Sequence, residues 1–101
     1  MEVSSVMSYF MHLRDGSEEL LDPEGVERES LDALRKAVLA TVRDLIGADV
    51  RDGGVIDFRF RIDAEDEDGV LVYSLPFQHA VSIIPADAGV NVVVGSFDAK
   101  R

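Results

Sequence analysis

The stretch SLDALRKAVLATVRDLIG, residues 30–47, decides the fold of this chain. Its apolar residues recur at spacings of three and four, which places them along one face of an α-helix. These residues are Leu31, Leu34, Val38, Val42 and Leu45, flanked by Ala37, Thr41 and Ile46. Ser30 is a good N-cap, because its hydroxyl can accept a hydrogen bond from the first turn, and Gly47 is a typical C-terminal stop. The pattern predicts a helix of about four and a half turns with one face packed on a sheet.

The segments on either side of this helix predict the strands of that sheet. Residues 6–13 alternate with apolar groups on both faces, and residues 20–21 are expected to form a short returning strand after an Asp-Gly turn. After the helix, residues 56–63 alternate strictly between apolar and charged side chains. An acidic loop at 64–69 then leads to a strand at 70–75, which predicts a β-hairpin. We therefore expect an α+β fold with a small, mainly antiparallel sheet, in the order β-(β)-α-β-β, and one long amphipathic helix on one face.

The strand expected at 56–63 assigns its side chains to two faces. Those expected to face the core are Ile56, Phe58, Phe60 and Ile62, and they alternate with Asp57, Arg59, Arg61 and Asp63. Arg59 and Arg61 would thus form a basic pair on the polar face of the sheet. Such a pair either binds acidic groups on neighbouring strands, or grips an acidic partner or a carboxylate ligand.

Composition excludes several classes of partner and site. The chain has 101 residues, of which 20 are acidic and 10 basic, giving a net charge of -10. Its pI near 4.4 argues against nucleic acid and anionic membranes, because phosphate contacts need Lys and Arg in excess. The absence of cysteine excludes disulfides and thiolate metal sites. No apolar stretch approaches the ~20 residues of a membrane helix, and the N-terminus lacks the basic region of a signal peptide, so we expect a cytoplasmic protein.

The C-terminal third is almost free of charge, with only Asp87 charged between Gly69 and Phe97. Residues 90–94 predict a valine-rich strand, which would be an aggregation hazard if it stayed uncovered. It is expected to pair either within the chain or with another chain. We therefore divide the chain into an α+β domain at 1–85 and a C-terminal extension at 86–101. The candidate interface residues in this extension are Val90, Val92, Val93, Val94 and Phe97.

Several short motifs stand out between Ser8 and Ile84. The sequence opens with Tyr9-Phe10-Met11-His12-Leu13-Arg14-Asp15-Gly16, has Asp22-x-x-Gly25 before the helix, and closes with Asp66-Glu67-Asp68-Gly69, Leu75-Pro76-Phe77 and Ala80-Val81. In these motifs the chain resembles a small bacterial domain family of unknown function. The resemblance implies a standalone α+β domain, and it implies no activity.

Residue types that carry chemistry do not form a recognisable motif. The acidic run that starts at Asp63 does not match a calcium-binding loop, because Asp68 stands where that loop needs glycine and Ser74 where it needs glutamate. His12 and His79 lie on separate elements without the spacing of a zinc site. We therefore predict no catalytic residue, no cofactor and no metal.

The leading hypothesis is a non-enzymatic protein-interaction or regulatory module, which is homo-oligomeric and has a protein as its partner. The alternative is a small-molecule or metal-dependent enzyme that uses an open sheet face with His12, Asp15, Arg59 and Arg61. The corresponding ligand-binding face would consist of Phe10, His12, Arg59 and Arg61. A third hypothesis is an acidic mimic of nucleic acid, which would require the acids of 15–32 and 63–68 to line one continuous stripe.

Overall fold

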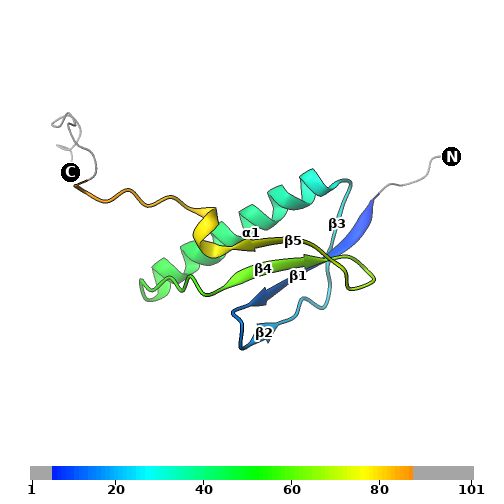
Figure 1. Ribbon diagram of the computed structural model, residues 1–101, viewed down its shortest axis with the longest axis horizontal. Coiled ribbons are helices and arrows are strands. Elements are labelled where there is room, and N and C mark those ends of the chain that lie inside the picture. The colour runs from blue at the N-terminus through cyan, green and yellow to red at the C-terminus, as the bar shows by residue number, and fades with distance from the viewer. Residues whose placement is uncertain (1–5, 88–101) are drawn as a thin grey trace.

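The computed structural model describes residues 6–87, in which one long helix lies across one face of a five-stranded sheet (Figure 1). The elements in chain order are β1 (Met7–Arg14), β2 (Glu19–Leu20), β3 (Val26–Arg28), α1 (Leu31–Asp52), β4 (Arg61–Glu65), β5 (Leu71–Pro76) and the short 3-10 helix η1 (Phe77–Ala80). All strand pairs in the sheet are antiparallel. The expected α+β fold is confirmed.

Strand β1 is the centre of the sheet, whose order is β2-β1-β4-β5. One edge of β1 pairs with β4. The other edge pairs with two short strands in succession, so that Tyr9 lies opposite Val26 of β3 and Leu13 lies opposite Leu20 of β2. Strand β5 pairs only with β4 among the described residues and forms an edge of the sheet.

The core lies between α1 and the sheet. Helix α1 buries four residues on one face, namely Leu34, Val38, Val42 and Ile46. They pack with buried residues of the sheet and η1, namely Tyr9, Ile62, Ala64, Leu75, Phe77 and Ala80. Each large apolar side chain buried in this way contributes roughly 1.5–3 kcal/mol. The helical stripe thus packs on the sheet as the spacing predicts, although Ile46 is buried and Leu31 is exposed.

Helix α1 begins where the sequence predicts and ends later. The Ser30 hydroxyl accepts a hydrogen bond from the Ala33 N–H at 3.0 Å, which confirms the N-cap. The predicted stop at Gly47 is wrong, since a single interior glycine costs only about 1 kcal/mol and the residues beyond it continue the helix. The helix ends at the glycine pair that follows Asp52. There Gly53 and Gly54 both donate to the Asp49 carbonyl, and Gly54 takes a φ of +74° that favours glycine.

The strand predicted at 56–63 is shifted in the structure. Residues 58–59 lie in a turn, and β4 starts only at Arg61. The Asp57 carboxylate accepts a hydrogen bond from the Arg59 N–H, and such a local side-chain bond competes with strand pairing. Phe58, which was expected in the core, is consequently exposed. Asp63 instead becomes the middle residue of β4.

The β4–β5 hairpin is confirmed. Its turn is built by Asp66, whose carboxylate accepts hydrogen bonds from the N–H groups of Asp68 and Val70 at 2.9 Å. Gly69 provides the positive φ of this turn, at +79°. The acidic loop is therefore a shaped turn in which one carboxylate orders the backbone.

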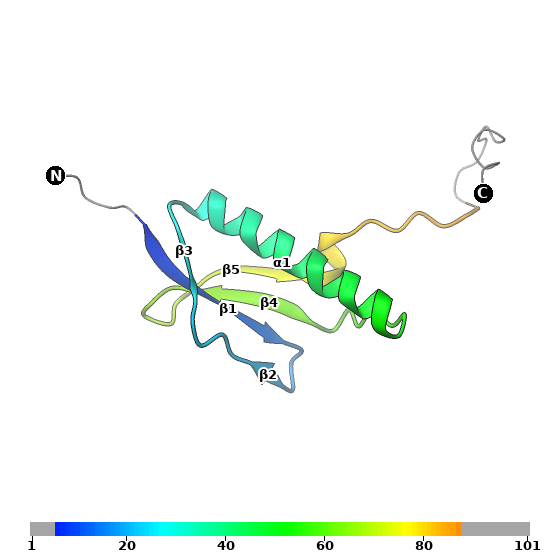
Figure 2. The same cartoon turned by 180° about the vertical axis from the view of Figure 1, so that it is seen from behind.

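Beyond β5 the chain turns through η1, packs Val81 against the core and then leaves the domain. Residues 81–87, which we call the arm, extend away from the sheet in both views (Figures 1 and 2). The strand predicted at 90–94 and the interface candidates Val90, Val92, Val93, Val94 and Phe97 lie outside the described residues. The proposed division into 1–85 and 86–101 therefore stays a prediction.

Candidate functional site

The sheet surface that faces away from α1 carries a cluster of polar side chains from three strands. They are His12 and Arg14 of β1, Arg61, Asp63 and Glu65 of β4, and Ser74 of β5, and we call this surface the polar face. The alternation of each strand produces it, because the intervening residues Leu13, Ile62, Ala64 and Leu75 pack toward the helix. The register places His12 opposite Asp63, and Asp63 opposite Ser74.

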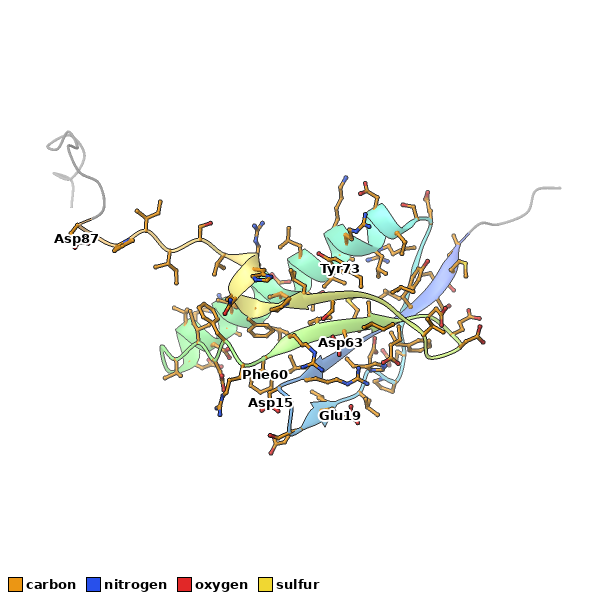
Figure 3. The ribbon with its side chains drawn as sticks, in the orientation of Figure 1. Asp15, Glu19, Phe60, Asp63, Tyr73 and Asp87 are labelled. Atoms are coloured by element: carbon orange, nitrogen blue, oxygen red, sulfur yellow. The ribbon has the colours of Figure 1, made fainter. Side chains whose placement is uncertain are left out.

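Asp63 is the centre of the polar face (Figure 3), and its side chain is only 6% exposed. Its carboxylate accepts hydrogen bonds from Ser74 Oγ at 2.6 Å, Arg61 Nε at 3.0 Å and Arg14 Nη1 at 3.0 Å. Burial by itself raises the pKa of Asp63, but the hydrogen bonds from Ser74, Arg61 and Arg14 lower it further than burial raises it. The result is a pKa below the usual range and an ionised carboxylate that joins three strands.

Arg14 extends this cluster across the sheet. Its Nε donates to Glu19 at 2.7 Å, and its Nη1 donates to both Asp63 and Glu65 at 3.0 Å. These side-chain hydrogen bonds raise the pKa of Arg14, the bond with Glu19 most of all. Arg14 therefore links β2 to β4 over the strand that carries it.

His12 is buried beneath the same surface and has a fixed hydrogen-bonding role. The Asp22 N–H donates to His12 Nδ1 at 3.0 Å, so this nitrogen carries no proton, and Nε2 lies 3.4 Å from Glu65 Oε1. The imidazole lies nearly parallel to the Phe10 ring, with an interplanar angle of 12°. His12 thus connects β1 to the loop that follows β2.

The side chain of Asp22 also holds this loop against β1. Its carboxylate accepts hydrogen bonds from the N–H groups of Met11, Glu24 and Gly25, each at 3.1 Å. Burial raises the pKa of Asp22, but these backbone hydrogen bonds lower it further, so that the net shift is downward. Gly25 has a φ of +76°, and a Cβ there would lie 2.9 Å from the Tyr9 carbonyl oxygen, so the loop needs glycine at this point.

The structure brings together some of the residues expected to form a ligand face and separates others. Phe10, His12 and Arg61 share the polar face. Arg59 does not, because it lies in the turn before β4, where its side chain is 78% exposed and paired with Asp57 at 2.8 Å. That hydrogen bond lowers the pKa of Asp57 to about 2. The expected basic pair of Arg59 and Arg61 on one strand face is therefore wrong.

Asp15, which the enzyme alternative grouped with His12 on an open sheet face, has a different role. It lies in the β1–β2 turn, where its carboxylate accepts hydrogen bonds from the N–H groups of Ser17 and Glu18 at 2.8 Å. The two ring nitrogens of His12 face the Asp22 N–H and Glu65 Oε1, so the structure does not bring His12 and Asp15 together. Within residues 6–87, no cluster of three or more histidine and carboxylate side chains has the arrangement of a metal site.

A small cavity of about 200 Å³ opens beside the polar face. It is lined by Arg14, Gly16, Ser17, Glu18, Glu19 and Arg61. Both arginines already bind carboxylates of the chain, and two glutamates line the same cavity. The cavity consequently has no excess of positive charge with which to hold an anion.

A second concave surface is apolar and lies between α1 and the β1–β2 side of the sheet. We call it the groove; its volume is about 290 Å³, and it is lined by Met11, Leu13, Leu20, Leu21, Asp22, Pro23, Thr41, Leu45 and Ile62. Leu20 and Leu21 remain exposed at its rim. The groove was not predicted from the sequence, although the two adjacent leucines within an acidic segment were a signal for it.

These features define a small α+β domain with an internally paired charged face and an uncovered apolar groove. The sequence comparison then identifies its family: residues 8–78 match the model of a family described as a domain of unknown function (DUF6894), and the chain belongs to that family. The match covers the polar face and the groove but ends before the arm. No curated protein and no solved structure matches the chain. Among the described residues, α1 is not apolar enough to cross a membrane, and no other helix is long enough.

Proposed function

We propose that this domain is a non-enzymatic protein-interaction module that forms a homodimer in the bacterial cytoplasm. The observation that carries the proposal is the arm, on which two adjacent isoleucines, Ile83 and Ile84, are 70% and 82% exposed. Burying an isoleucine side chain contributes roughly 1.5–3 kcal/mol, so an arm of this kind gains stability when a partner covers it. A chain without cysteine suits a reducing compartment.

The distribution of charge supports self-association through the arm. Two copies of a chain with net charge -10 repel each other, so their contact must lie on surfaces without acids. Residues 81–86 provide such a surface, because Asp87 is the first charged residue after η1. Interface cores are depleted in charged residues in the same way.

The polar face supports a structural role more than a catalytic one. Its buried carboxylate, Asp63, is held by two arginines and a serine of its own chain. A substrate at this surface would have to displace these charge-assisted hydrogen bonds, which are among the strong ones in proteins. Its acids are also paired with arginines, which gives no support to a mimic of nucleic acid.

The test is the mass of the full chain in solution, measured by size-exclusion chromatography with light scattering over a wide concentration range. We expect the wild type to be dimeric and the double variant Ile83→Ser, Ile84→Ser to be monomeric. Val55→Ser is the matched control, since Val55 is an equally exposed apolar residue in the loop after α1. A wild type that stays monomeric throughout, or a dimer that survives loss of both isoleucines, would overturn the proposal.

A further inference from the structure

We infer that the arm of one copy docks in the groove of a second copy, and that the two copies exchange arms reciprocally. The inference rests on the proposed function, and it identifies the surface that receives the arm. The two features are complementary: the arm presents Ile83 and Ile84 to solvent, and the groove leaves Leu20 and Leu21 uncovered at its rim.

The groove has the shape and chemistry to hold a short apolar segment. Its floor is Ile62, which is buried in the core, and its walls come from β1 and from Thr41 and Leu45 of α1. Its volume of about 290 Å³ lies at the low end of ligand pockets, which suits a few side chains better than a large molecule. A segment with two adjacent isoleucines fits these dimensions.

The groove carries one charged group, and that group is already occupied. Asp22 lines the groove, but its carboxylate binds the N–H groups of Met11, Glu24 and Gly25. The uncharged residues 81–86 of the arm therefore meet no unpaired charge of the groove lining. Contact at this place also sets the uncharged residues 81–86 of the arm, and not an acidic segment of the second chain, against the groove.

The position of the arm favours docking in the groove of a second copy over docking in the groove of its own chain. The arm starts after η1, which follows β5, whereas the groove lies beside β2 at the other edge of the sheet. Three strand spacings of about 4.8 Å separate these two edges. The base of the arm is also fixed on α1, because Arg43 Nε donates to the Ala80 carbonyl at 2.8 Å, and from there the arm leads away from β2 (Figures 1 and 2).

Reciprocal exchange gives the assembly a closed form. Within residues 6–87 each chain has one arm and one groove, so a two-fold dimer fills both grooves and leaves neither arm exposed. A one-way contact builds either a larger ring or an open chain with a free arm and a free groove at its ends. The exchanged dimer is therefore the smallest assembly that leaves no arm and no groove free.

Cysteine cross-linking tests the contact directly, because the full chain contains no cysteine of its own. One protein carries Leu21→Cys and the other carries Ile84→Cys, and the two are mixed under mild oxidation. We expect a disulfide-linked heterodimer, since a disulfide needs Cα atoms within about 7 Å of each other. Replacing the first variant by Val55→Cys, at an exposed site outside the groove, should abolish the cross-link.

A second measurement distinguishes failure of this inference from failure of the proposed function. Leu21→Asp alters the groove and leaves the arm intact, whereas Ile83→Asp with Ile84→Asp alters the arm and leaves the groove intact. Each protein alone should be monomeric, and their mixture should regain dimers, because the mixed pair retains one intact contact. A wild type that is monomeric overturns both proposals.

Two other outcomes overturn the docking of the arm in the groove of a second copy. If Leu21→Asp remains as dimeric as the wild type while the arm variant is monomeric, the arm docks elsewhere. If a chain that carries both Leu21→Cys and Ile84→Cys cross-links within itself and stays monomeric on a non-reducing gel, the arm fills the groove of its own chain.

Discussion

Replacing Asp63 by asparagine should destabilise the domain more than replacing any exposed acid. The substitution preserves the volume of the side chain but removes the charge that Arg14 and Arg61 share. These two arginines lie directly opposite each other on β1 and β4, and like charges in that position repel. Asp63 is thus the group that makes their pairing favourable.

The magnitude follows from the contacts of Asp63. A hydrogen bond to a charged group contributes roughly 1.5–3 kcal/mol, and breaking a buried ion pair costs about 3–5 kcal/mol. Asparagine keeps one acceptor oxygen for the Ser74 hydroxyl, so that hydrogen bond can remain. Arg61 is partly exposed, so solvent screening weakens its ion pair with Asp63. We therefore expect a loss of about 2–3 kcal/mol, which for a domain of this size lowers the melting temperature by about 10–20 °C.

The assay is urea unfolding followed by circular dichroism at one fixed protein concentration, because dimerisation would make stability depend on concentration. The folded pKa of Asp63 lies below the unfolded value of 3.8, so its contribution is present above about pH 4 and is lost as the pH falls through the folded pKa. The gap between wild type and Asp63→Asn should therefore be full at neutral pH and narrow in acid. Asp57→Asn, which breaks an exposed pair, should shift the unfolding midpoint far less.

Either of two results would refute this reasoning. The variant could be as stable as the wild type at neutral pH, which would mean that Asp63 is dispensable to the polar face. The difference in stability between wild type and Asp63→Asn could also stay constant in acid, which would mean that the variant loses stability through packing and not through charge.

Two further substitutions test the backbone that positions the polar face. Gly25→Ala should lower the free energy of unfolding in urea by about 2–3 kcal/mol, because alanine is strained at a φ of +76° and its Cβ would meet the Tyr9 carbonyl. Gly69→Ala should lower it by only about 1 kcal/mol, because Gly69 has a similar φ but open space around it. Equal losses at the two glycines would contradict the proposed close approach. Ser30→Ala should lower the free energy of unfolding by about 1 kcal/mol and reduce the helical signal in circular dichroism. Ser30→Asp, which keeps a capping oxygen, should retain both the stability and the helical signal. An alanine variant of wild-type stability would show that the cap contributes nothing.

Sequence patterns predicted those parts of the fold that depend on neighbouring residues. The start of α1 at Ser30 and the β4–β5 hairpin are confirmed, because a cap and a turn are each built from residues a few positions apart. The predicted bounds of β4 were wrong because the alternation of apolar and charged residues at 56–63 fits a continuous strand as well as a turn followed by a shorter strand. Asp57 decides between them by binding the Arg59 N–H.

The polar face could be predicted only in part, because its contacts join distant segments. Strand parity correctly placed His12 and Arg61 on one surface. The burial of Asp63 could not be predicted in this way, since it depends on Arg14, which lies 49 residues away in the chain, and on the register between their strands. The same holds for the groove, whose walls come from elements that meet only in the folded domain.

The acidic residues explain why the neutral surfaces are the better place for a partner. The chain has a net charge of -10, but several of its carboxylates bind groups of their own chain. Asp15, Asp22 and Asp66 accept backbone hydrogen bonds in turns, and Asp63 holds two arginines. A partner that bound these carboxylates would have to break hydrogen bonds that stabilise the fold. A partner that packed on the exposed side chain of Ile84 would break no hydrogen bond, because that side chain has no polar atom. Association through the arm therefore adds apolar burial at little cost to the domain, which is the condition under which self-association is favourable.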